Sequence, residues 1–159
     1  MRYKLLGKSG LRVSELCLGA MTFGEEWGWG TPKEESRKIF AAFAEAGGNF
    51  IDTANQYTNG TSERFLGEFI ASERESFVIA TKYTVPSRPD DPNSAGNHRK
   101  SMMQSLHGSL KRLKTDYIDL YWLHAWDFLT PVEEVMRALD DMIRVYGHGK
   151  GDHLKEFWS

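Results

Sequence analysis

The chain alternates short apolar runs with longer amphipathic segments, and this order predicts strands and helices in turn. Apolar residues at helical spacing mark the helices, as Met102, Leu106 and Leu113 do within 97–114. The short, nearly continuous apolar runs between them are typical of buried strands. After a hairpin over residues 1–14, the expected strands are 15–19, 49–52, 77–80 and 117–123, and the expected helices are 31–46, 62–70, 97–114 and 130–143.

Residue types that favour helix ends mark several of these boundaries. Thr31, Pro32 and Glu34 form a capping-box pattern, with Thr31 as the cap and Pro32 as the first helical residue. Gly47 is expected to end that helix in a left-handed conformation, which costs glycine little. Ser62 is expected to cap the second helix, because its hydroxyl can accept from a free backbone N–H.

Regular alternation of strand and helix predicts a parallel sheet with helices outside it. The glycine fingerprint of dinucleotide-binding doubly wound sheets is absent after the expected strands, and Gly28-Trp29-Gly30 lacks the third glycine. We therefore expect an α/β fold of the barrel kind. It would comprise an N-terminal hairpin and four β/α units, which is half of a (β/α)8 TIM barrel.

Composition narrows the classes of partner. The 159 residues carry a net charge of −2, which gives no electrostatic reason to expect nucleic acid or an anionic membrane as a partner. Apolar runs are too short to cross a bilayer or to serve as a signal peptide. Cys17 is the single cysteine, so no internal disulfide can form. A lone cysteine fits a reducing compartment, so we expect a cytoplasmic protein.

Four polar residues follow or end consecutive expected strands, where the active groups of parallel α/β folds gather. They are Asp52, Tyr57, Lys82 and His124. Each also has an ordinary structural explanation, because aspartates cap helices, tyrosines pack in loops, strand-end lysines are solvated and single histidines are usually structural. Their convergence on one edge of the sheet favours a catalytic role.

The set has a chemical logic as well. A phenol has a pKa of about 10 and is a poor acid at neutral pH, but a nearby ammonium group favours the phenolate. A carboxylate keeps that ammonium charged and in place, and a neutral imidazole can orient a carbonyl oxygen. Such groups can protonate an oxygen while hydride arrives at carbon. The histidines and the single cysteine lack metal-ligand spacing, so we expect no metal site.

Several motifs together resemble the aldo-keto reductase family, and its bacterial and potassium-channel-β-like branches most of all. The resemblance runs from about Tyr3 to Arg144. Its motifs are Gly10-Leu11-Arg12-Val13-Ser14, Leu18-Gly19, Thr22-Phe23-Gly24, Phe50-Ile51-Asp52-Thr53-Ala54 with Tyr57, Ser62-Glu63, Thr81-Lys82, Ser105-Leu106 and Asp116-Tyr117-Ile118-Asp119-Leu120, ending in His124.

The resemblance implies NADPH-dependent reduction of aldehydes or ketones. In that reaction Tyr57 would be the general acid, Lys82 with Asp52 would tune it, and His124 would orient the carbonyl. The residues implied near the nicotinamide ribose are Gly19, Ala20 and Met21, together with Asp52. The tryptophans that would line the substrate pocket, or simply pack in loops, are Trp27, Trp29 and Trp126.

Length departs from the family pattern. A full (β/α)8 barrel has about 250 residues, and most cofactor-holding groups of the family lie in its second half. We therefore expect a half-barrel over 1–144 and an unmatched C-terminal tail over 145–159, as a truncation would produce.

Open strand edges and a bare apolar face favour a homo-oligomer. Three readings stay open: a reductase rebuilt by dimerisation, an inactive half-barrel that serves as a binding module, and a truncated gene product without function.

Overall fold

A computed structural model describes residues 1–86, 88 and 90–146. It contains a two-stranded antiparallel hairpin and a four-stranded parallel sheet in the order β3-β4-β5-β6. The strands are β1 (Tyr3–Leu5), β2 (Arg12–Ser14), β3 (Leu18–Gly19), β4 (Phe50–Asp52), β5 (Val78–Tyr83) and β6 (Leu120–Leu123). Because neighbouring strands of the parallel sheet are also consecutive in sequence, each β/α unit adds one strand beside the last. This confirms the predicted α/β fold with four units of a barrel.

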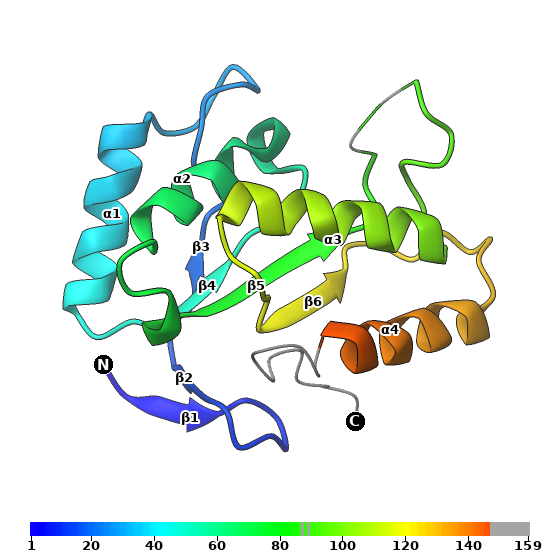
Figure 1. The fold of residues 1–159 in the computed structure, drawn as a ribbon. Coiled ribbons are helices and arrows are strands. Elements are labelled where there is room, and N and C mark those ends of the chain that lie inside the picture. Colours follow the sequence, from blue (N-terminus) through cyan, green and yellow to red (C-terminus); the bar gives the residue numbers. More distant parts are fainter. Residues whose placement is uncertain (87, 89, 147–159) are drawn as a thin grey trace.

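Helices connect the parallel strands (Figure 1). They are α1 (Lys33–Glu45), α2 (Thr61–Phe69), α3 (Arg99–Leu113) and α4 (Val132–Tyr146), with the short 3-10 turns η1 (Tyr57–Gly60) and η2 (Arg74–Ser76). In this view α1, α2 and α3 lie across one face of the sheet, α4 lies beside β6, and the β1–β2 hairpin lies at the opposite end of the sheet from the long loop before α3. Residues 147–159, which make up most of the predicted tail, lie outside the described part of the chain.

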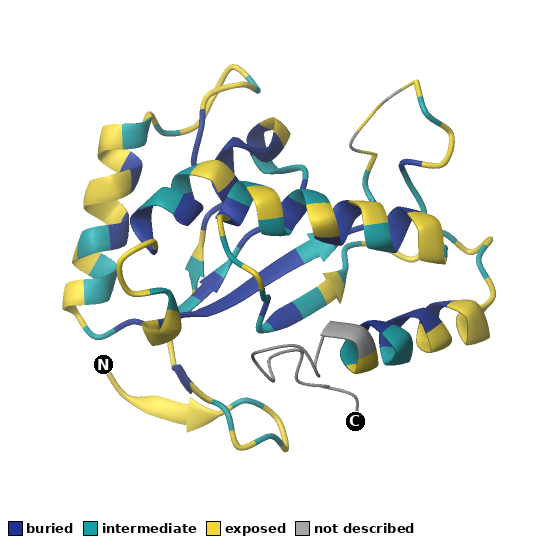
Figure 2. Ribbon diagram, viewed as in Figure 1, coloured by how far each residue is buried: buried dark blue, intermediate teal, exposed yellow. Residues whose placement is uncertain are grey.

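Two apolar clusters occupy the two faces of the sheet, because successive side chains of a strand point to opposite sides. Ile51 and Ile79 pack with the helices, and both are fully buried. Their neighbours Phe50 and Val78 point the other way and pack with Val13 of the hairpin. Figure 2 shows the continuous buried stretch along β5. The hairpin therefore covers one end of the sheet face that points away from the helices. The edge that carries the predicted site residues lies at the other end of the sheet.

Two of the predicted helix caps are wrong. Pro32, not Thr31, occupies the cap position of α1, and no side chain caps that helix. Thr31 has another role, since its backbone N–H donates to the carbonyls of Thr22 and Gly24. Ser62 lies inside α2, and its hydroxyl donates to the Ala20 carbonyl at 2.7 Å. Thr31 and Ser62 both donate hydrogen bonds to the loop over residues 20–30. The local sequence does not reveal these partners.

The end of α1 agrees with the prediction, whereas the end of β5 does not. Gly47 follows α1 with φ +81°, as predicted for a left-handed helix end. Strand β5 continues three residues past the predicted end, so Lys82 lies within the strand and not after it. The strands at the two edges of the sheet are β3 and β6, and Trp122 on β6 is 39% exposed. The described sheet is thus less covered at β6 than the apolar run predicted.

Candidate active site

Three of the four predicted polar residues meet at the carboxyl edge of the sheet. Lys82 Nζ donates to Asp52 Oδ2 at 2.5 Å and to Tyr57 Oη at 3.1 Å. The parallel register explains the first contact: Asp52 pairs with Ala80, and Lys82 is two residues further along the same face of β5. Tyr57 reaches the ammonium group from η1, directly after β4.

Lys82 also has an acceptor that sequence reasoning missed. Its Nζ donates to the Thr53 carbonyl oxygen at 2.7 Å, so three oxygens surround the ammonium group. The side chains of Lys82 and Asp52 are 16% and 31% exposed, which leaves the pair partly open to solvent. Every residue has a main-chain carbonyl, so the residue type of Thr53 does not indicate this contact. It depends on the path of the backbone after β4. These three contacts fix the position of the ammonium group.

His124 completes the group through a ring contact. Its imidazole lies edge-on to the Tyr57 ring, with the centroids 5.6 Å apart and the planes at 85°. The His124 backbone N–H donates to the Tyr83 carbonyl at 3.0 Å, which fixes the residue just beyond β6. Burial lowers the pKa of His124, the nearby Lys82 charge lowers it further, and Asp52 opposes the change. The imidazole is therefore neutral at neutral pH.

The buried ring nitrogen of His124 indicates which tautomer the site favours. Nδ1 is buried and has no hydrogen-bond partner among the residues that the structure describes. Leaving a buried N–H without an acceptor costs free energy, so the proton is expected on Nε2, with the bare lone pair on Nδ1. A neutral imidazole in that form has an N–H available to an oxygen atom at the site.

The structure places two of the three predicted pocket tryptophans near Tyr57. The Trp27 ring lies 6.4 Å from the Tyr57 ring at 85°, and Trp29 lies 5.5 Å from Trp27. Trp29 is half exposed. Trp126 is 38% exposed and lies two residues after His124, at the same edge of the sheet. The loop before α1 therefore brings aromatic side chains against the Tyr57 ring.

Besides Asp52, the residues predicted near the cofactor ribose are Gly19, Ala20 and Met21, and these differ in exposure. Gly19 is exposed and pairs with Asp52 across β3 and β4, and a Cβ at Gly19 would meet nothing within 4 Å. Met21 is 43% exposed. Ala20 is fully buried, its N–H donates to the Asp52 carbonyl and its own carbonyl accepts from Ser62 Oγ. Gly19 and Met21 are thus the members of this set that a bound molecule can touch.

Cys17 lies near the charged pair as well. Partial burial and, to a lesser extent, the Asp52 carboxylate raise the pKa of its thiol, Lys82 opposes both, and the net value is about 11. The thiol therefore stays protonated at neutral pH, and thiolate chemistry is not expected there. Among the described residues there is no cluster of three potential metal ligands.

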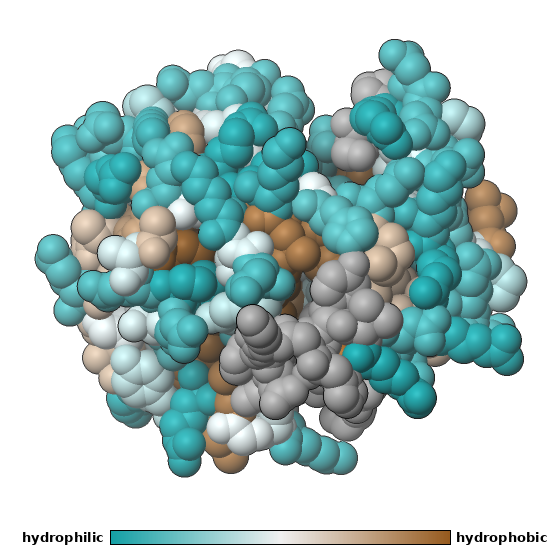
Figure 3. Space-filling model, viewed as in Figure 1, coloured by the Kyte–Doolittle hydropathy of each residue, from teal (hydrophilic) through white to brown (hydrophobic). Residues whose placement is uncertain are grey.

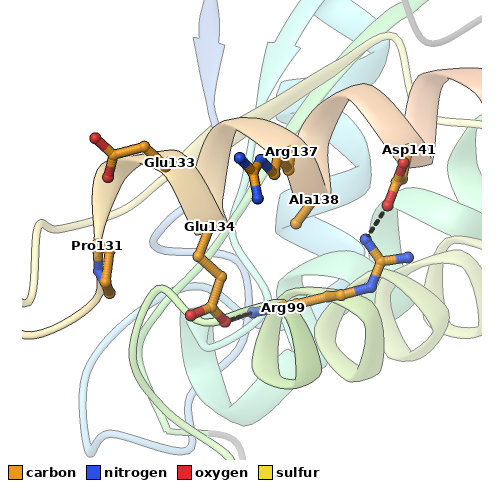
Figure 4. Close-up of a pocket in the computed structure, with 7 residues that line it drawn as sticks. All are labelled: Arg99, Pro131, Glu133, Glu134, Arg137, Ala138 and Asp141. Carbon is orange, nitrogen blue, oxygen red and sulfur yellow. Dashed lines mark hydrogen bonds and ion pairs between the residues drawn. The ribbon is translucent and has the colours of Figure 1, made fainter.

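A separate groove lies on the outer side of the barrel, between α3 and α4 (Figure 4). Its walls are charged: Arg99 pairs with Asp141, and the Arg99 backbone N–H donates to Glu134 Oε1 at 3.1 Å. The groove is lined by Arg99, Pro131, Glu133, Glu134, Arg137, Ala138 and Asp141. None of the predicted site residues is among them. The helix-covered face shown in Figure 3 is largely hydrophilic, with apolar atoms visible in a band across its middle.

Comparison with known proteins identifies the family. The aldo/keto reductase family model matches residues 15–151. Norsolorinic acid reductase stcV of Emericella nidulans is 48% identical over 145 residues, which cover 85% of this chain and 38% of that protein. The NADP(+) aryl-alcohol dehydrogenase of Phanerodontia chrysosporium is 44% identical, over 84% of this chain and 38% of its own length.

A Saccharomyces cerevisiae protein, described provisionally as an aryl-alcohol dehydrogenase, is 42% identical over 90% of this chain and 73% of its own length. The chain therefore spans 38% of the first two relatives and most of the third. No described helix has the length and apolar content needed to span a membrane. The family match confirms the resemblance seen in the motifs: the chain belongs to the aldo/keto reductase family.

Proposed function

We propose that the site supports NADPH-dependent reduction of a carbonyl compound, with Tyr57 as the general acid. The observation that carries this proposal is the short chain of contacts from Asp52 through Lys82 to the Tyr57 hydroxyl, at 2.5 and 3.1 Å. The contact places a positive charge 3.1 Å from the oxygen that would become negative after proton transfer. Family membership supports oxidoreductase chemistry of this kind.

The proton balance of the reaction follows from these contacts. When bound, NADPH supplies a hydride to the carbonyl carbon. The Tyr57 hydroxyl gives its proton to the carbonyl oxygen, and the phenolate that remains lies 3.1 Å from the Lys82 ammonium group. Because Asp52 and the Thr53 carbonyl hold that ammonium group, its charge needs no reorganisation as the phenolate forms. General acid catalysis of this kind contributes roughly 10²- to 10⁴-fold to the rate.

His124 is suited to orient the substrate. Its lowered pKa keeps the imidazole neutral, and the unpartnered Nδ1 favours a proton on Nε2. That N–H can donate to the carbonyl oxygen while the adjacent Tyr57 hydroxyl protonates it. A neutral donor is appropriate here, because an imidazolium would compete with Tyr57 as the acid.

The residues present fit the nicotinamide end of the cofactor. Gly19 offers open backbone beside Asp52, and the exposed side chain of Met21 lies in the same segment. A flat ring can approach the edge of the sheet closely where no Cβ intervenes. The chain covers 38% of its NADP(+)-dependent relative from Phanerodontia chrysosporium, so we assign no residues to the phosphates.

We further propose an aromatic carbonyl substrate. Trp27 packs against Tyr57, Trp29 packs against Trp27, and the partly exposed Trp126 follows His124 by two residues at the same edge of the sheet. Aromatic side chains stack on flat ring systems and exclude water from them. Relatives named for norsolorinic acid and aryl alcohols support an aromatic substrate in the family branch to which this chain is similar.

Cofactor binding and turnover can be tested separately. We expect titration calorimetry to show NADPH binding, and absorbance at the cofactor band to fall with an aromatic aldehyde. Tyr57→Phe should keep binding and lose turnover by 10²-fold or more, on the order expected for general acid catalysis. Tyr3→Phe is the matched control, because the Tyr3 hydroxyl donates to Gly47 O far from the site. No binding at millimolar NADPH would contradict the proposal and leave the binding module and the functionless truncated product as the remaining readings.

Assembly and location stay predictions from the sequence. Strands β3 and β6 each have one neighbour in the described sheet, and free strand edges favour association. We propose a homo-oligomer in the cytoplasm. A compact monomer in size exclusion with light scattering would contradict the oligomer.

A further inference from the structure

The backbone directly after Tyr57 adopts a conformation that side chains rarely take. Thr58 has φ 46° and ψ 47°, and Asn59 has φ 55° and ψ 36°, so two successive residues are left-handed. Asparagine visits this region readily, but a β-branched residue such as threonine is a true outlier there. Strain of this kind persists only where surrounding contacts hold it, and it often accompanies functional sites.

The Thr58 hydroxyl supplies such contacts. Its Oγ1 donates to the Phe23 carbonyl at 2.5 Å and accepts from the Ser62 backbone N–H at 3.2 Å. Thr58 is fully buried, so water cannot replace either partner. One hydroxyl thus ties the turn that carries Tyr57 both to the loop before α1 and to the first turn of α2.

Other residues bring the loop close to this turn. A Cβ added to Gly24, at φ +113°, would lie 2.7 Å from Thr58 Oγ1, so the close approach requires glycine. Trp27 Nε1 donates to Asn59 Oδ1 at 3.3 Å, and Thr61 Oγ1 donates to Glu26 Oε1. The loop over residues 20–30 and the Tyr57 turn are therefore built as one unit.

We propose that Thr58 is a positioning residue, whose hydroxyl locks the 20–30 loop to the Tyr57 turn and so sets the phenol against Lys82. The inference rests on the proposed function, because it gives the placement of Tyr57 a catalytic purpose. Loss of the hydroxyl leaves the Phe23 carbonyl and the Ser62 N–H without partners and lets the left-handed turn relax. Since Tyr57 is the preceding residue, that relaxation moves the phenol relative to the ammonium group.

A matched pair of variants tests the hydroxyl separately from the volume. Thr58→Val keeps the size and branching of the side chain but lacks the hydroxyl, whereas Thr58→Ser keeps the hydroxyl. We expect Thr58→Val to lower kcat for an aromatic aldehyde by roughly 10- to 100-fold, as small misplacements of reacting groups do, with KM near the wild-type value. Thr58→Ser should restore most of kcat. The rate is taken per folded enzyme, with the folded fraction of each variant measured separately by circular dichroism; a purely structural role would lower that fraction and leave kcat per folded enzyme at the wild-type value.

Hydrogen exchange gives a second readout that needs no turnover. The Ser62 amide and the amides of residues 22–27 should lose protection in Thr58→Val and keep it in Thr58→Ser, while the amides of α3 stay protected in both. Wild-type kcat in Thr58→Val, equal losses in both variants, or unchanged exchange at Ser62 and 22–27 would overturn the inference. If wild-type protein binds no NADPH, the proposed function fails by itself, and the exchange result still decides whether the hydroxyl couples the loop to the turn.

Discussion

Arg112→Leu should destabilise the fold strongly, because it leaves a buried carboxylate without its charged partner. Glu63 is fully buried on α2, its Oε2 accepts from Arg112 Nε at 2.6 Å and its Oε1 accepts from Thr81 Oγ1 at 2.6 Å. These two bonds join α2 to α3 and to β5. Breaking a buried ion pair by removing one partner costs about 3–5 kcal/mol.

Urea unfolding measures this loss. With a slope of about 2 kcal/mol per molar urea, the midpoint should fall by about 1.5–2.5 M. Lys38→Ala is the control, because its ion pair with Glu35 is exposed, with side chains 71% and 55% accessible, and its midpoint should match that of the wild type.

A double variant isolates the unpaired charge as the cause. In the Arg112→Leu background, Glu63→Gln removes the charge while its amide oxygen can still accept from Thr81 Oγ1. Stability should then recover in part, since a neutral amide is far less costly to bury than a lone carboxylate. A loss below about 1 kcal/mol in Arg112→Leu, the range of a surface pair, would refute the reasoning. So would a double variant less stable than the single one.

Three further changes have expected outcomes. Gly30→Ala should lower the free energy of unfolding by more than about 1 kcal/mol, because φ is +126° and the new Cβ would lie 2.0 Å from the Gly24 carbonyl oxygen. Equal urea midpoints for the variant and the wild type would contradict this. Leu106→Ala, at a side chain 1% exposed, should cost about 2–5 kcal/mol in the same assay. Burial disfavours the charged form of Asp127, but donors from Asn97, Thr130 and Leu129 outweigh it and lower its pKa. A lowered carboxyl pKa stabilises the fold above the unfolded pKa of about 3.9 and loses that effect as pH falls below it. Asp127→Asn should therefore show a shallower loss of stability than wild type between about pH 4 and pH 2, and parallel profiles would count against it.

The meeting of Asp52 and Lys82 could be predicted from sequence because strand geometry is regular. Consecutive parallel strands end at one edge, and the two-residue period of a strand fixes which side chains share a face. The helix caps could not be predicted in the same way. Thr31 and Ser62 have the right residue types, but their polar groups serve the loop over 20–30. Whether a polar residue caps a helix depends on which hydrogen-bond partners the fold brings near it. The sequence gives the residue type but not those partners.

Local spacing and residue type are enough to predict the alternation of strand and helix, the left-handed glycine after α1 and the four polar residues. The finer features of the site depend on tertiary packing. The contact of the Thr53 carbonyl with Lys82, the lack of a partner for His124 Nδ1 among the described residues and the left-handed backbone of Thr58 all depend on segments far apart in the chain. None of these features can be predicted from residue type, because each depends on what packs against it.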